Sequence, residues 1–189
     1  MIYPTWIQLK WTMLSVGLVL VLAHLVALLK PDAARGWLRK FPRNYELGVM
    51  LAIVATIWFY LLVKFMDLGE FTNWRPTVLF LTPVAGVLTI FFMRDFLAVR
   101  ALGTLSLLIA EPLLESAFLR DEPIRLLLVT LVYLWILFGM FWVGMPYTLR
   151  DQIGWVSATE KRWRAAAFAG LAYGALLCVG SFFVPLLVR

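Results

Sequence analysis

Residues 11–29 read WTMLSVGLVLVLAHLVALL, and this stretch decides the fold class. A transmembrane helix needs about 20 predominantly apolar residues, whereas the apolar core of a cleaved secretory signal has only about 7–15. Lipid leaves α-helices and closed β-barrels as the spanning structures, and the run shows no alternation of apolar and polar positions. The stretch therefore predicts a transmembrane helix that is retained in the protein.

Five further apolar segments repeat this pattern along the chain of 189 residues. The chain is 63% hydrophobic and 15% charged, whereas a soluble domain is about 45–50% apolar and about 25% charged. The sequence thus predicts an all-α fold, that of a polytopic α-helical integral membrane protein with about six transmembrane helices and short loops. We expect a single helical-bundle domain over residues 1–189 and no soluble domain, with spans at 11–29, 47–66, 76–93, 96–118, 124–144 and 165–188.

The fourth segment, 96–118, is the weakest of the six. Its 11 leucine, isoleucine, valine and phenylalanine residues favour insertion by roughly 3–7 kcal/mol in total. Glu111 opposes insertion by about 2.5–3.5 kcal/mol at a helix centre, and Pro112 follows it directly. We expect neighbouring helices to shield this span, and the protein has five spans if 96–118 does not cross.

Basic residues are unevenly distributed, and lysine and arginine favour the cytoplasmic side of a membrane. With six spans and both termini on the non-cytoplasmic side, the inner side holds 11 of the 17 basic residues, against 10 if 96–118 does not cross. This orientation, with very short loops, predicts a bacterial inner membrane. Anionic headgroups are the expected partners of seven inner basic residues: Arg35, Arg39, Lys40, Arg43, Lys161, Arg162 and Arg164.

Local signals predict where several helices begin. Asp32 is suited to cap a short interfacial helix, Asp95 to cap the fourth span, and Ser157 with Glu160 has the spacing of a capping box. The interfacial helix is expected to lie in the membrane surface. Its expected lipid-facing residues are Trp37, Leu38 and Phe41, and its water-facing residues are Arg35, Arg39 and Lys40.

Four polar residues form a stripe on the fourth span: Arg100, Thr104, Glu111 and Glu115. Their separations of 4, 7 and 4 residues place them on one helical face. An acidic group inside a membrane is a functional hypothesis by default, so the stripe is a candidate site for protons or ions. The structural alternatives for Glu111 are a helix break, a bond to Tyr133 or Thr130, or contact with a partner subunit.

Small residues recur on the sixth span at four-residue spacing, at Ala166, Gly170, Gly174 and Cys178. Such a face lets another helix approach closely. It predicts a packing seam, either within the bundle or between subunits. Cys178, the single cysteine, is expected to serve packing rather than catalysis, because no base stands near it in the sequence.

His24 is the single histidine and lies within the first span. One imidazole can be an axial ligand of a haem or a chlorophyll-type pigment, but it can equally bond to a neighbouring helix. The sequence requires no cofactor and predicts no metal site, since it lacks a second histidine and a cysteine cluster.

No enzyme signature is present: the sequence has no HExxH motif, no Gly-rich phosphate loop and no intramembrane Ser-His or paired-aspartate arrangement. Most basic residues lie in short loops between apolar spans, which also argues against nucleic-acid binding. We therefore expect a non-enzymatic accessory or scaffold subunit of a larger membrane complex, bound to other membrane subunits or to itself. The alternatives are a compact transporter or channel using the polar stripe, and a pigment or haem carrier using His24.

Overall fold

The computed structural model describes residues 8–184, and within them the chain is helical without a strand. Six helices are long and apolar enough to span a bilayer, which confirms the all-α, polytopic membrane fold. They are α1 (Leu9–Leu29), α3 (Tyr45–Phe65), α4 (Arg75–Phe92), α5 (Leu97–Ala117), α6 (Arg125–Gly144) and α8 (Glu160–Phe182). The shorter elements are α2 (Pro31–Lys40), η1 (Phe41–Arg43), η2 (Gly69–Trp74) and α7 (Tyr147–Val156).

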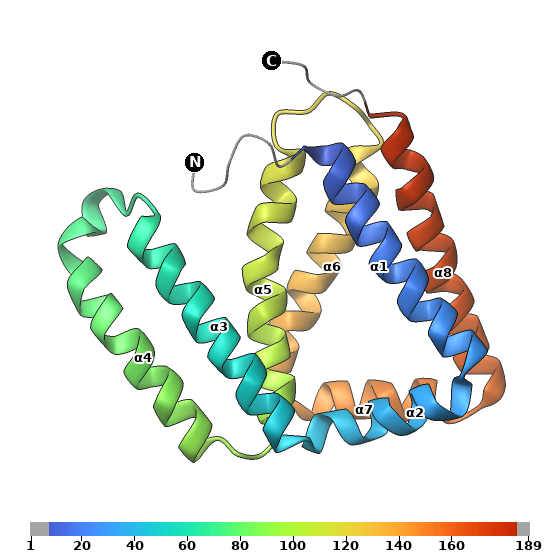
Figure 1. Cartoon of the computed structure of the whole chain (residues 1–189), viewed down its shortest axis with the longest axis horizontal. Helices are drawn as coiled ribbons and strands as arrows, with labels where there is room; N and C mark the ends of the chain where they lie inside the picture. Colours follow the sequence, from blue (N-terminus) through green and yellow to red (C-terminus); the bar gives the residue numbers. More distant parts are fainter. Residues whose placement is uncertain (1–7, 185–189) are drawn as a thin grey trace.

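The long helices form two close pairs and one leaning hairpin (Figure 1). The pairs α1–α8 and α5–α6 meet at one end of the molecule and diverge toward the other, where α2 and α7 run across. The α3–α4 hairpin meets α5 near the α2–α7 end and leans away from it toward the opposite end. The first turn of α1 and the last turn of α8 lie at the end away from α2 and α7.

Glycines bring the paired helices into backbone contact. A Cβ atom added to Gly17 of α1 would lie 2.8 Å from the Gly174 carbonyl oxygen and 2.7 Å from the Cys178 Sγ. A Cβ atom on Gly103 of α5 would lie 2.8 Å from the carbonyl oxygen of Gly139 in α6. Three of the predicted small residues of α8, Gly170, Gly174 and Cys178, therefore pack inside the bundle against α1, whereas Ala166 is exposed.

The apolar core lies where the two pairs meet. Leu9, Met13, Leu128, Val132 and Leu177 are fully buried there, drawn from α1, α6 and α8, and α5 adds Ala110, Leu113 and Ala117. The Tyr173 hydroxyl donates a 2.7 Å hydrogen bond to the Leu127 carbonyl and so ties α8 to α6. This core fixes α5, the helix with the polar stripe, between its neighbours.

Several predicted boundaries need correction. Asp95 does not cap α5, because Phe96 occupies the N-cap position in the left-handed region with φ 57°. Thr159 caps α8 by accepting a hydrogen bond from the Arg162 amide, so Ser157 is not the cap. The sixth helix begins at Glu160 and ends at Phe182, and the expected span residues 185–188 lie outside the described residues.

The interfacial helix exists, but two of its side chains lie elsewhere than predicted. Phe41 is 7% exposed and packs against Ala98, Val99 and Leu149 instead of lipid. Arg35 points to α8, where it pairs with Glu160 and lies over the Trp163 ring. The helix α7, which crosses the same end of the molecule as α2 (Figure 1), was not among the predicted elements.

Candidate functional site: the polar face of α5

Arg100 lies one turn into α5 and contacts the end of α6. Its Nη1 donates a 2.8 Å hydrogen bond to the carbonyl oxygen of Val143, in the last turn of α6. A cation is favourable there because the carbonyl groups of a helix C-terminus are left without intrahelical partners. The Arg100 Nε is buried and has no hydrogen-bond partner in the described chain. Arg100 therefore joins the ends of two spans.

Thr104 bonds within its own helix, since its hydroxyl donates a 3.0 Å hydrogen bond to the Arg100 carbonyl. Arg100 and Thr104 both line a pocket of ≈ 390 Å³ between α3, α4 and α5. Glu111 and Glu115 are not among its lining residues. The structure thus brings two residues of the stripe to one pocket and leaves the two carboxylates outside it.

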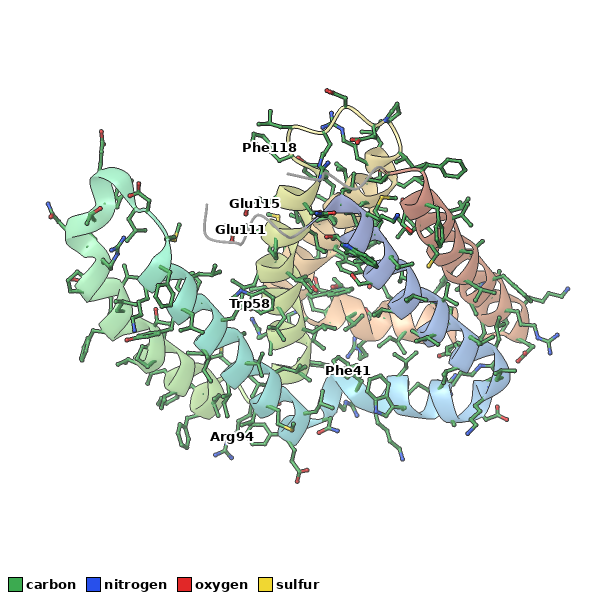
Figure 2. All side chains as sticks on the ribbon, turned by 45° about the horizontal axis from the view of Figure 1, so that its top comes forward. Phe41, Trp58, Arg94, Glu111, Glu115 and Phe118 are labelled. Atoms are coloured by element: carbon green, nitrogen blue, oxygen red, sulfur yellow. The ribbon has the colours of Figure 1, made fainter. Side chains whose placement is uncertain are left out.

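Glu111 is exposed and Glu115 is partly exposed. Neither makes a hydrogen bond or ion pair to any residue within 8–184, so the proposed bonds from Glu111 to Tyr133 or Thr130 do not form. Figure 2 shows both carboxylates on the side of α5 that faces the α3–α4 hairpin. Glu111 stands six residues before Ala117, the end of α5, which places it about 9 Å inside the helix end.

The hairpin leaves this face of α5 open. Toward the end of α5 that carries Glu111 and Glu115, α3 leans away from α5 (Figure 1). Because α4 packs on the far side of α3, it does not cover this part of α5 either. Thr82 is the one buried residue of α4, and Phe80 and Phe92 are 71% and 81% exposed. The result is a polar face in α5, opposite an apolar hairpin that packs on α5 through Ala52 of α3, beside Leu97 and Ala101.

Replacement of Arg100 by methionine is expected to destabilise the α5–α6 pair by about 1.5–3 kcal/mol, the usual value of a hydrogen bond to a charged group. The measurement is thermal unfolding in mild detergent. The matched control is Arg43→Met, because Arg43 is exposed and forms no hydrogen bond or ion pair to residues 8–184. Equal unfolding temperatures for the two variants would contradict a structural role of Arg100.

His24 packs at the α1–α8 seam. Its Nδ1 lies 2.8 Å from the Leu20 carbonyl oxygen, and its ring fills the space beside Gly170, where an added Cβ would overlap Nε2. With Nδ1 donating to Leu20, Nε2 is the nitrogen left for a metal, and it lies against the α8 backbone. The arrangement favours the helix-packing interpretation of His24 over axial ligation.

The predicted lipid-binding residues fall into two groups. Some have protein partners: Arg39 donates to the Ser157 hydroxyl and carbonyl, Arg164 pairs with Glu160, and Arg162 lies over the Trp155 ring. Lys40, Arg43 and Lys161 are exposed and form no hydrogen bond or ion pair to residues 8–184. The second group is the one available to headgroups in this structure.

Comparisons with protein-family models, with curated proteins and with solved structures find no match to this chain.

Proposed function

We propose that this chain is an accessory or scaffold subunit of a larger membrane complex, and that the polar face of α5 receives a membrane helix of another polypeptide. The observation that carries this proposal is Glu111. It is exposed well inside a transmembrane helix and has no polar partner within residues 8–184. Lipid tails cannot hydrogen-bond to a carboxyl group, so its exposure to them is unfavourable by up to about 3 kcal/mol.

The partner's chemistry follows from the groups on this face. A helix that lies beside α5 needs a hydrogen-bond donor opposite Glu111, either a basic side chain or an amide or hydroxyl. The exposed apolar side chains of the α3–α4 hairpin that face α5 supply the rest of the contact surface, with Phe59 and Leu81 among them. Docking of such a helix removes both the carboxyl group and these apolar side chains from lipid.

No specific observation favours the transport alternative. The four stripe residues do not line one cavity, because the pocket of Arg100 and Thr104 does not include the carboxylates. Arg100 is engaged by the α6 carbonyl. A proton or ion route would need continuous polar lining across the membrane, whereas the described residues of the stripe lie at separate depths.

Our proposal places the α2–α7 end in the cytoplasm of a bacterial cell, with the inner membrane around the spans. The support is charge: Lys30, Lys40, Arg43, Arg150 and Lys161 all belong to elements or loops at that end, and basic residues favour the cytoplasmic side. Exposed lysines at this end then meet anionic headgroups.

The experiment is purification of the tagged chain from its native membrane in mild detergent, with every component identified and counted by mass spectrometry. We expect one other integral membrane polypeptide at fixed stoichiometry, with a donor residue inside one of its spans. A chain that purifies alone, or as a homo-oligomer free of other components, would contradict the proposal.

A further inference from the structure

A second cavity lies at the α2–α7 end, away from the polar face of α5. Its volume is ≈ 700 Å³, and it is lined by side chains from α1, from Lys30 after it, and from α2, α7 and α8, among them Leu22, His24, Ala27, Trp37 and Trp163. Leu22, Val26 and Trp37 in its wall are more than half exposed, so the cavity is reached from outside the protein. At this depth the outside is lipid.

The walls are apolar with one charged group. His24 and Lys30 are the polar side chains among the lining residues. Both nitrogens of the His24 ring are engaged by the protein, since Nδ1 lies near the Leu20 carbonyl oxygen and Nε2 lies against Gly170. Lys30 is exposed at the junction of α1 and α2 and has no hydrogen bond or ion pair from its side chain to residues 8–184. It is therefore the cation that can bind an anion at the mouth of the cavity.

The position of the cavity matches the boundary between headgroups and acyl chains. Interfacial helices lie at this boundary, with apolar side chains inserted about 5–10 Å, and α2 forms one wall. Tryptophan is favoured at the same level, and the cavity has Trp37 on α2 and Trp163 on α8. The Trp163 indole donates a 2.9 Å hydrogen bond to the Ala27 carbonyl, which fixes the wall between α8 and α1.

We propose that this cavity binds one anionic phospholipid of the surrounding leaflet, with an acyl chain between α1, α2 and α8 and the phosphate at the Lys30 ammonium group. Basic sites between transmembrane helices on the cytoplasmic side are a known physical basis for anionic-lipid recognition. The inference is independent of the proposed partner on α5, since the two sites share no residue.

A partner helix does not fit this place. A spanning helix is about 10–12 Å across and about 30 Å long, several times the volume of the cavity. The helices α2 and α7 also cross this end of the molecule (Figure 1), and a helix passing through the cavity would meet them. A flexible acyl chain that ends at the headgroup level meets neither obstacle.

The test is native mass spectrometry of the purified, delipidated full chain after incubation with equal amounts of phosphatidylglycerol and phosphatidylcholine. We expect one retained phospholipid per chain and about fivefold preference for phosphatidylglycerol, because one lysine near a membrane contributes about that factor. Lys30→Gln should remove the preference. Lys161→Gln is the control, since Lys161 lies at the same end but not in the cavity wall.

A cavity-filling pair of variants tests the acyl-chain part. Ala166 is exposed and lines the cavity, so Ala166→Phe should abolish the retained lipid. The control is Ala169→Phe, because Ala169 is exposed on the same helix but lies outside the cavity. Unfolding temperatures of all variants establish that they are folded. The proposal is overturned if the wild-type chain retains no lipid, if it binds both lipids equally, or if the two phenylalanine variants retain the same amount.

Discussion

Replacement of Gly17 by valine will separate α1 from α8 and unfold the bundle at a much lower temperature than the wild-type chain. Even the first added carbon would lie 2.7 Å from the Cys178 Sγ and 2.8 Å from a carbonyl oxygen of α8. Overpacking of this kind costs about 1–3 kcal/mol where neighbours can shift. A backbone neighbour shifts less easily than a side chain, so we expect a loss of about 3 kcal/mol.

Cys178 supplies a direct reporter of this seam. It is the single cysteine of the chain and lies opposite Gly17, so its rate of reaction with a maleimide reports how far α1 and α8 have separated. We expect faster labelling in Gly17→Val than in the wild-type chain. The control is Gly144→Val, because an added Cβ at Gly144 meets no atom within 4 Å. Equal labelling rates in the two variants would show that the glycine contact does not hold the pair together.

Replacement of Glu111 by leucine should have opposite effects on the isolated chain and on the complex. Insertion of α5 is expected to improve by up to about 3 kcal/mol, because an acidic group is removed from the span. Binding of the partner is expected to weaken by about 1–2 kcal/mol, the usual contribution of an interhelical hydrogen bond. That loss corresponds to a roughly 5- to 30-fold higher Kd, and so to about 3- to 15-fold less co-purified partner where the wild-type chain is half-saturated.

Two control variants separate the possible reasons for that loss. Glu111→Gln keeps a hydrogen-bond acceptor, so it should retain most of the partner. Glu70→Leu removes a carboxyl group from η2, in the loop between α3 and α4, and should leave binding unchanged. The account of Glu111 fails if the leucine variant binds its partner as well as the wild-type chain does.

The sequence predicts the long apolar helices well because each needs one long apolar run. Five of the six helices begin and end within about two residues of the expected bounds. They include the weakest predicted segment, 96–118, which forms the continuous helix α5. The sixth differs because its first turn carries Glu160, Lys161 and Arg162. These residues are helical without being apolar, so hydropathy does not reveal them.

Contacts between helices are harder to predict than the helices. The small-residue spacing on α8 indicated a seam, but Gly17 on the other side of that seam is a single glycine without a repeat. The helix α7 was missed because it has no long apolar run, although Leu149, Ile153 and Val156 have helical spacing. The sequence predicted the polar stripe as one face of α5. It did not predict that α3 diverges from α5 and leaves Glu111 exposed.

The central claim, that another polypeptide docks on the polar face of α5, is tested most directly by site-specific photo-crosslinking in the native membrane. The photoreactive residue replaces Leu108, which lies on the same face of α5 as Glu115 by helical geometry. In the control it replaces Leu176, which is 54% exposed on α8. We predict one crosslinked product of fixed mass from position 108 that contains a second membrane polypeptide, and none from position 176. Crosslinks to lipid alone from position 108, or the same products from both positions, would contradict the account.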